Sequence, residues 1–255
     1  MSIKIAERHK LILGKIENEG FVTVSDLSKE FNVSSVTIRK DLKLLEELNL
    51  LFRSHGKAIP ANPYTTEKSV NEKVKIHKEE KNRIAQAAVE TLVPNDSIIL
   101  ASGTSIIEFA HHLHDLQDLT VLSASLNAAL IISERTNIDV LQLGGVIRKS
   151  SSSVIGPIAE NLLAEFNFTK LFLGVDGIDI EYGLTTTSSM EASLNKKMIS
   201  AAQKIIVLAD SSKFGRKGFG RICGLEEVDQ IITDNNIEDK IKKELTELGI
   251  DVVIV

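Results

Sequence analysis

The hydrophobic pattern of the first fifty residues predicts three helices. Apolar residues recur at helical spacing over residues 6–19, and Gly20 stops this helix. Ser25 is a suitable N-cap for a short helix over 26–31, and Ser34 is a suitable N-cap for a third helix after a tight turn. The third helix is expected to run to about Leu48, with its apolar sector made by Ile38, Leu42, Leu44, Leu45 and Leu48.

Two short apolar stretches follow the third helix. Residues 50–53 and 57–59 predict strands on either side of Ser54-His55-Gly56, where Gly56 suits a turn that needs a positive φ. Helix, turn, helix and hairpin follow one another in the order of a winged helix-turn-helix, whose second helix enters the major groove of DNA.

The pattern changes twice after this point. Residues 60–78 contain two prolines, mixed charges and few apolar positions, so we interpret them as a linker. From residue 79, helical stretches alternate with short apolar stretches. The predicted helices are 79–92, 104–114, 126–135, 157–165, 188–203 and 236–248, and the predicted strands are 97–101, 119–123, 138–143, 169–175, 204–209, 228–232 and 250–255.

Strands that alternate with helices predict a mostly parallel sheet with helices on both faces. The run Ile205-Ile-Val-Leu-Ala is apolar without alternation, as expected of a strand buried on both sides. The fold class is therefore α/β. We expect a small winged helix-turn-helix domain over 1–59, a linker over 60–78 and a larger α/β domain with a mostly parallel sheet over 79–255.

Charge is distributed unevenly between these parts. The chain of 255 residues has a formal net charge of −5, but residues 1–57 carry ten Lys and Arg against eight Asp and Glu, and the remainder carries twenty against twenty-seven. A mildly basic head on an acidic body suits a protein in which only the head meets phosphates. The single cysteine, Cys223, allows no internal disulfide and is most simply a packing residue.

The polar face of the third predicted helix is basic near its start. Arg39 is suited to a bidentate guanine contact, and Lys40 and Lys43 are suited to phosphates. The alternative is a helical module for protein contacts with a merely solvated basic face, but the capped turn, the cations and the hairpin occur in the order that favours DNA. The candidate DNA-binding residues are Ser35, Val36, Thr37, Arg39, Lys40, Lys43 and, in the hairpin, Arg53, His55 and Lys57.

This region also resembles a known family. The segments Val33-Ser-Ser-Val-Thr-Ile-Arg-Lys-Asp-Leu and Leu51-Phe-Arg-Ser-His-Gly-Lys-Ala closely resemble the N-terminal signature of the DeoR family of sugar-metabolism regulators. The family usually has two glycines after the histidine of the wing, whereas here Lys57 follows Gly56 and adds a cation to the wing.

Small polar residues follow several predicted strands of the body. The loop Ser102-Gly-Thr-Ser opens a helix, where backbone N–H groups, hydroxyls and the helix dipole suit a phosphate, although any strand-to-helix turn favours such residues. Loops after parallel strands converge at one edge of the sheet. There Lys213 suits a phosphate and Asp176 or Asp179 suits sugar hydroxyls; turn chemistry and a solvated lysine are the simpler alternatives.

The body resembles the DeoR sensor domain in Ser102-Gly-Thr-Ser, Gly144-Gly145, Phe172-Leu-Gly-Val-Asp-Gly-Ile-Asp and Leu208-Ala-Asp-Ser-Ser-Lys-Phe-Gly. That domain is similar in fold to ribose-5-phosphate isomerase, so the resemblance implies a phosphorylated sugar as effector. Ala101 and Ala124 replace an Asp and an Asn that are usual in the family, and we expect both changes to remove polar groups from the crevice. The candidate effector-binding residues are Ser102, Gly103, Thr104, Ser105, Ser123, Gly144, Gly145, Asp176, Gly177, Asp179, Glu191 and Lys213.

An isomerase is the alternative function. Glu191 and Lys213 resemble an acid and a lysine of the isomerase in their motif position, but the loop around Gly183 lacks a second lysine, so we expect a sensor and no enzyme. His111 and His114 are spaced to face one ligand, but no further residue completes a metal site. We expect no metal and no cofactor.

The expected partners follow from these assignments. They are double-stranded operator DNA, a small phosphorylated sugar and further copies of the chain, because helix-turn-helix proteins commonly bind repeated half-sites as symmetric oligomers. We find no leader-like segment and no apolar run long enough for a bilayer, and we expect a cytoplasmic protein without membrane contact. The resemblance implies repression that the effector relieves.

Overall fold

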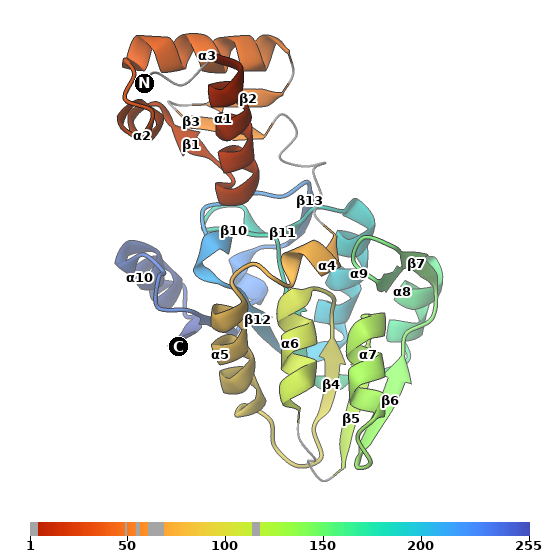
Figure 1. Cartoon of the computed structure of the whole chain (residues 1–255). Helices are drawn as coiled ribbons and strands as arrows, with labels where there is room; N and C mark the ends of the chain where they lie inside the picture. The colour runs from red at the N-terminus through yellow and green to blue at the C-terminus, as the bar shows by residue number, and fades with distance from the viewer. Residues whose placement is uncertain (1–4, 49, 55–56, 61–68, 114–117) are drawn as a thin grey trace. The chain divides into compact units, whose positions relative to one another are not determined.

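The structure is a computed structural model that describes residues 5–48, 50–54, 57–60, 69–113 and 118–255, without the side chains of residues 17, 52, 54 and 60. The chain divides into two compact units, Met1–Thr66 and Glu67–Val255 (Figure 1). We call them the head and the body. Four residues with predicted roles lie outside the described residues: Asn49, His55, Gly56 and His114.

The head contains the predicted winged helix-turn-helix elements. Its helices are α1 (Ile5–Glu19), α2 (Val24–Glu30) and α3 (Ser35–Glu47), and its strands are β1 (Val22–Thr23), β2 (Leu51–Ser54) and β3 (Lys57–Pro60). The strands form an antiparallel sheet in the order β1-β3-β2. Ile12, Ile16, Leu27, Ile38 and Leu42 belong to the buried core that these elements share.

Two local expectations for the head were wrong, and one buried residue was not foreseen. The N-cap of α2 is Thr23, whose hydroxyl accepts from the backbone N–H of Asp26, and not Ser25. Leu44 and Leu48 are exposed instead of joining the apolar sector of α3. Asp41 takes a buried position beside Ile38 and Leu42, because a buried partner from α1 satisfies its carboxylate.

The body is built on a seven-stranded sheet in the order β15-β14-β12-β9-β4-β5-β6, and every adjacent pair is parallel. The α/β class with a parallel sheet is thereby confirmed. Its strands are β4 (Ser97–Leu100), β5 (Leu119–Ser123), β6 (Ile138–Gln142), β9 (Phe168–Gly174), β12 (Ala202–Leu208), β14 (Gln230–Thr233) and β15 (Asp251–Ile254).

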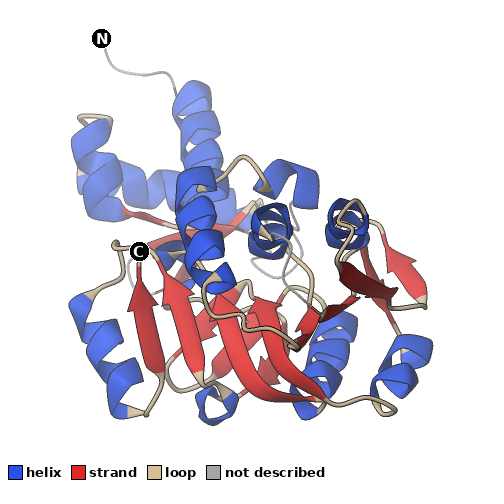
Figure 2. Cartoon of the chain, turned by 90° about the horizontal axis from the view of Figure 1, so that it is seen from below, coloured by secondary structure: helices blue, strands red, loops and turns tan. Residues whose placement is uncertain are grey.

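Helices cover both faces of this sheet (Figure 2). Ile98 and Leu100 pack with α5, α6 and α7 on one face, whereas Ile99 and Leu122 pack with α8 and α9 on the other. Alternate strand residues therefore enter two separate cores, which explains why the strands are apolar without alternation. The helices are α5 (Lys78–Val89), α6 (Thr104–His112), α7 (Leu126–Ser133), α8 (Pro157–Leu163), α9 (Ser189–Ser200) and α10 (Asp239–Glu247).

Several small elements of the body were not predicted. Strands β7 (Val146–Arg148) and β8 (Ser153–Ile155) form an antiparallel ribbon, and β10 (Gly177–Asp179), β11 (Gly183–Thr186) and β13 (Gly220–Cys223) form a small sheet. Two 3-10 turns, Ser211–Lys213 and Leu225–Glu227, follow β12 and β13. The short helix α4 (Val70–Lys73) lies within the segment that we interpreted as a linker.

Candidate functional site

Helix α3 exposes a basic stripe. Its N-cap Ser34 accepts from the backbone N–H of Thr37 at 3.1 Å, and the hydroxyl of Thr37 lies 2.9 Å from that of Ser34. The backbone N–H and the hydroxyl of Thr37 are therefore both engaged with Ser34, whereas Ser35 is exposed. The stripe itself has the spacing i, i+3, i+4, i+7, and all four of its side chains are exposed: Val36, Arg39, Lys40 and Lys43.

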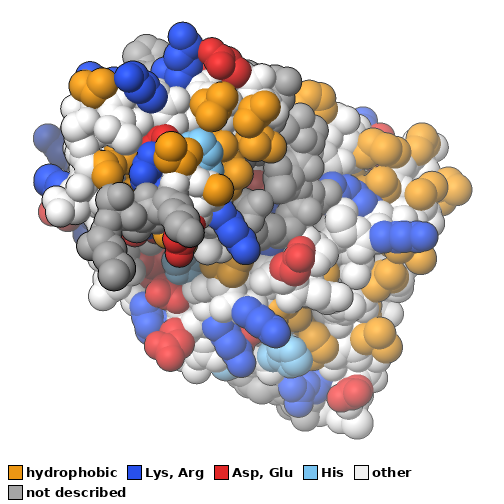
Figure 3. Space-filling model, turned by 45° about the horizontal axis from the view of Figure 1, so that its top comes forward, with side chains coloured by type: hydrophobic (Ala, Val, Ile, Leu, Met, Phe, Trp, Pro, Cys, Tyr) orange, Lys and Arg blue, Asp and Glu red, His pale blue; other side chains and the backbone are white. Residues whose placement is uncertain are grey.

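The cations of the head differ in their partners. Arg39 and Lys40 have no ion-pair partner among the described residues, and Lys and Arg side chains reach the surface on the face shown in Figure 3. Lys43 lies 3.8 Å from Glu47 one turn later. Arg53 of the wing is held by Glu46, with Nε 2.7 Å from Oε2. Arg39 and Lys40 are therefore the most available groups for DNA.

The described part of the wing supplies one more cation. Lys57 is exposed, and its Nζ lies 4.2 Å from the ring centre of Phe21. A cation over an aromatic face is weakly attracted to it and keeps its charge at the surface. Lys57 is therefore a further exposed cation of the head.

An ion pair that the sequence did not reveal lies beneath the stripe. Arg8 of α1 donates to both carboxylate oxygens of Asp41, and His9 Nε2 lies 3.1 Å from Oδ1. Burial alone would raise the pKa of Asp41, but its bonds with Arg8 and His9 hold that pKa below its ordinary value. The carboxylate is therefore ionised and anchors α3 to α1.

The body has a cleft at the carboxyl edge of its sheet. Three parallel strands end there: β4 before Ser102, β9 before Asp176 and β12 before Lys213. This arrangement confirms that the loops after those strands converge. The cleft is lined by Val70, Lys73, Ser102, Gly103, Thr104, Ser105, Ser150, Ser151, Gly174, Val175, Asp176, Thr186, Glu191, Asn195 and Lys213.

The loop at the start of α6 offers backbone donors to the cleft. Gly103, with φ at +119°, is the N-cap of α6, and no side chain caps this helix. The first backbone N–H groups of a helix have no intrahelical acceptor and attract anions. Gly174 lets β9 approach this loop, because a Cβ there would lie 2.8 Å from the carbonyl oxygen of Ser102.

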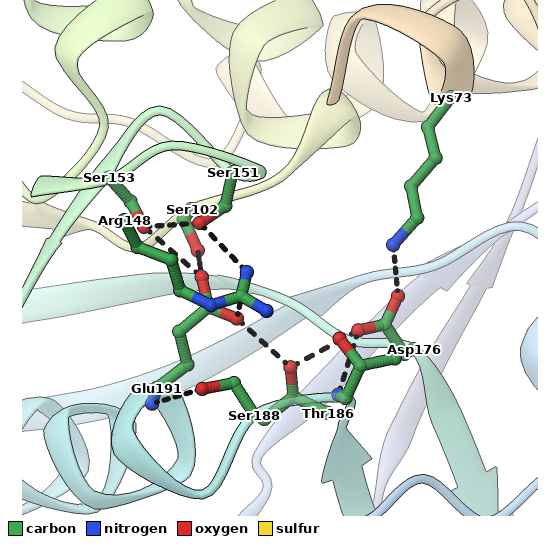
Figure 4. A network of polar contacts seen from close by, with 10 residues as sticks. Lys73, Ser102, Arg148, Ser151, Ser153, Asp176, Thr186, Ser188 and Glu191 are labelled. Carbon is green, nitrogen blue, oxygen red and sulfur yellow. Dashed lines mark hydrogen bonds and ion pairs between the residues drawn. The ribbon is translucent and has the colours of Figure 1, made fainter. Parts of the chain in front are cut away.

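Asp176 is a charged group of the cleft. Lys73 donates to its Oδ1 at 2.8 Å, and the backbone N–H of Thr187 donates to its Oδ2 at 3.2 Å (Figure 4). Burial alone would raise the pKa of Asp176, but the positive charges of Lys73 and Lys213 hold it well below its ordinary value. Asp176 is therefore an ionised acceptor suited to hydroxyl groups.

Glu191 is the centre of a second network in the cleft (Figure 4). Its position in the first turn of α9 is set by Ser188, whose hydroxyl accepts from the backbone N–H of Glu191. Ser102 and Ser153 both donate to Oε1, and Arg148 Nη1 lies 3.4 Å from Oε2. The network joins β7, β8 and the α6 loop to α9.

Positive charge gathers beside Asp176. Lys73 and Lys213 line the cleft, and Lys81 of α5 is buried close enough to both for their charges to act on it. Burial, opposed by the charge of Asp210 and assisted by those of Lys213 and Lys73, lowers the pKa of Lys81 to about 8. Like charges repel one another, so an anion in the cleft beside Lys73 and Lys213 is favoured.

Some predicted effector residues do not line the cleft. Ser123 is fully buried and donates to the carbonyl oxygen of Ser125. Asp179 accepts from backbone N–H groups of its own turn and pairs with Lys217. The glycines Gly144, Gly145 and Gly177 also lie outside the lining, and Ala101 and Ala124 are core residues.

Sequence reasoning missed part of the lining. Lys73 comes from the segment interpreted as a linker, and Ser150 and Ser151 come from the turn between the unpredicted strands β7 and β8. A short capped segment, Ser69 to Glu72, is visible in the sequence as a capping box and was the available signal for α4. Nothing local indicates that Arg148 faces Glu191.

The described residues contain neither a metal-binding arrangement nor a membrane-spanning helix. No group of three His, Cys, Asp or Glu side chains among them is arranged to hold a metal ion. No helix among them has both the length and the apolar character needed to cross a bilayer. Cys223 is half-buried, and burial raises the pKa of its thiol to about 12.

Comparison with known families covers both units. Residues 8–63 match the family described as the DeoR-like helix-turn-helix domain. Residues 76–235 match the family described as the DeoR C terminal sensor domain. The two matches follow the order of the units along the chain, so the resemblance suggested by the sequence motifs is confirmed over most of its length.

Individual relatives align over nearly the whole chain. A protein of Escherichia coli O157:H7, which bears the name of an aga operon transcriptional repressor, is 36% identical over 98% of this chain and 94% of its own. The HTH-type transcriptional regulator GlpR of Haloferax volcanii is 34% identical over 97% of each chain. A structure of D-ribose-5-phosphate isomerase with phospho-erythronic acid is 19% identical over 54% of each chain, with a TM-score of 0.41.

Proposed function

This chain belongs to the DeoR family of DNA-binding transcriptional regulators, and we propose that it represses genes of carbohydrate metabolism until a phosphorylated sugar occupies its cleft. Its relatives are regulators and not enzymes. The observation that carries the effector assignment is that Lys73 and Lys213 line the same cleft as Gly103, the N-cap of α6.

The chemistry of the cleft suits two parts of one ligand. The backbone N–H groups at the start of α6 and the cations Lys73 and Lys213 favour an anion, and a phosphate has the oxygens to accept from several of them. Asp176 is ionised and can only accept hydrogen bonds, so it suits a hydroxyl group that donates one. A polyhydroxylated phosphate ester meets both requirements, whereas a free sugar meets one.

The head supports an interaction with operator DNA through α3. Arg39 and Lys40 project from an exposed stripe without neutralising partners among the described residues, as phosphate and base contacts require. We infer that the protein acts as a symmetric oligomer on a repeated or palindromic operator, because one α3 reads only one half-site. Such a regulator works in the cytoplasm, where the DNA is.

A mobility shift with the DNA upstream of the protein's own gene tests this proposal. We expect binding without effector and release by one or more members of a panel of pentose and hexose phosphates. The corresponding free sugars should leave the complex intact at the same concentrations, since they lack the anion. Failure to bind any upstream DNA would reject the regulator assignment, and release by free sugars alone would reject the anion cleft.

A further inference from the structure

The segment that follows the head forms one wall of the cleft. Helix α4 is the first helix of the body after its boundary at Glu67, and its residues Val70 and Lys73 both line the cleft. The backbone N–H of Val70 donates to the carbonyl oxygen of Ser150 at 2.7 Å. The chain that leaves the head is therefore in contact with the cleft wall before the sheet begins.

Lys73 provides the second attachment of α4. Its side chain crosses to the end of β9, where Nζ donates to Oδ1 of Asp176 at 2.8 Å (Figure 4). The two residues are 103 positions apart in the sequence. Both side chains keep about a quarter of their surface accessible, at 28% and 24%, so a ligand in the cleft can reach them.

Lys81 provides a third attachment. Its Nζ donates to the carbonyl oxygens of Lys73 at 2.8 Å and Ile76 at 2.5 Å, and the residue is only 4% exposed. A buried ammonium therefore holds the carboxyl end of α4 against α5. The charges of Lys73 and Lys213 also act on this ammonium.

Among the described residues, the ammonium of Lys73 has one acceptor, Asp176. It has three N–H donors, and one of them is directed at Asp176. The other carboxylate oxygen of Asp176 accepts from Thr187 and lies 3.1 Å from the hydroxyl of Thr186, so the carboxylate stays in place without Lys73. An anionic oxygen in the cleft can thus accept from Lys73 while the pair with Asp176 persists.

We propose that Lys73 binds the effector directly and that the bound anion holds α4 against the cleft. Ligand binding in the cleft thereby acts on the chain segment that leads to the head. This inference rests on the proposed function, because it takes the cleft as the effector site. It adds a ligand-binding residue and a route of coupling: the ligand bridges Lys73 of α4 and the α6 loop, so its binding energy acts on α4.

Anion binding by matched variants tests the role of Lys73. Lys73→Gln keeps the length of the side chain and removes its charge, and Lys75→Gln makes the same change at an exposed position of the same segment. Isothermal titration of the full chain uses inorganic phosphate, D-ribose 5-phosphate and D-glucose 6-phosphate as probes. For each probe that binds the wild type, we expect Lys73→Gln to raise Kd by roughly 10-fold to 100-fold, the effect of one charge-assisted hydrogen bond.

The outcomes separate the two proposals. Equal Kd values for wild type, Lys73→Gln and Lys75→Gln would overturn the role of Lys73 and leave the anion cleft intact. If none of the three probes binds the wild type, the anion cleft fails and the role of Lys73 fails with it. An equal loss in both variants would show a general charge effect and would also overturn the specific role of Lys73.

Hydrogen exchange of α4 distinguishes ligand binding from a merely structural ion pair. Whether Lys73 binds ligand or only forms a structural ion pair, Lys73→Gln should speed amide hydrogen exchange at residues 70–76 in the absence of ligand. Only the proposed role makes a bound sugar phosphate slow exchange there in the wild type and not in Lys73→Gln, measured at ligand concentrations that saturate each protein. Faster exchange at α4 on ligand binding would mean that the ligand displaces Lys73, and would overturn the proposal.

Discussion

Arg8 and Asp41 form a buried, two-point ion pair between α1 and α3, with Nε 2.7 Å from Oδ2 and Nη2 3.0 Å from Oδ1. Two parallel contacts fix an orientation as well as a distance. Successive helical residues differ by about 100°, so holding Asp41 inward turns Arg39 outward. The pair therefore sets the rotation of α3 about its own axis.

Asp41→Asn should destabilise the head. The substitution keeps the shape of the side chain but removes the negative charge from the buried two-point pair with Arg8, and breaking such a pair should lower the free energy of unfolding by about 3 kcal/mol. Chemical denaturation of the full chain, followed by circular dichroism, measures the change. Glu47→Gln on the exposed face of α3 is the control and should cost less than about 0.5 kcal/mol. Equal effects of the two variants would contradict a stabilising role for the pair.

The same pair predicts a pH dependence. Because the pKa of Asp41 is lower in the folded head than its ordinary value of 3.8, the stability it contributes is present above that value and is lost as the pH falls through the lower folded-state pKa. The stability difference between wild type and Asp41→Asn should therefore shrink as the pH falls below about 4. Denaturation curves at several pH values check this, and a difference that grows toward acid would have the wrong sign.

Arg39→Ala and Lys40→Ala should weaken operator binding in different ways. If Arg39 contacts a base pair, its loss should weaken the binding free energy by roughly 1–3 kcal/mol and relax the preference for one base pair of the operator. If Lys40 contacts a phosphate, its loss should lower the slope of log affinity against log salt concentration by about one. Mobility shifts at several salt concentrations measure both effects. Lys240→Ala, at an exposed position of α10, makes the same charge change and should leave operator binding unaltered. Full operator affinity in the Arg39 and Lys40 variants would reject the assignment of α3.

Gly103→Ala and Gly14→Ala should have opposite effects on stability. A Cβ at either position meets no atom within 4 Å, so space does not distinguish them. Gly103 has φ at +119°, which is strained for alanine and should cost about 1–2 kcal/mol, whereas Gly14 lies within α1, where alanine should add about 0.5–1 kcal/mol. Thermal unfolding of both variants measures the signs. A neutral Gly103→Ala variant would mean that the α6 loop adapts without strain.

Anion binding should weaken above about pH 8. Lys81 has a pKa lowered to about 8 chiefly by burial, and an anion that offsets the charges of Lys73 and Lys213 should raise it. Below pH 8 Lys81 already carries its proton. Above pH 8 anion binding must be accompanied by proton uptake at Lys81, so the affinity for the anion falls as the pH rises. Sulfate is the probe, since its charge is constant over this range. Titrations in buffers of different ionisation enthalpy detect the proton uptake, and a constant affinity between pH 7 and 9.5 would exclude this linkage.

The sequence by itself determined the helices and the hairpin of the head, the main helices and sheet strands of the body, and their order. Caps such as Ser34, the spacing of Ile38, Leu42 and Leu45, and apolar runs such as β12 are local signals, because a helix or a buried strand must satisfy its own backbone and present its own apolar face. The α6 loop and Asp176 were predicted as cleft residues for the same reason, since their places after parallel strands follow from the element order.

The tertiary structure alone decided which charged groups meet. Asp41 looks like a surface residue in the sequence and becomes buried because Arg8, 33 positions earlier, reaches it. Lys73 lies in a polar stretch without a periodic pattern, yet it pairs with a carboxylate 103 positions away. Neither pairing leaves a local pattern, because an ion pair depends on the distance between two side chains in space, and packing of the whole unit sets that distance.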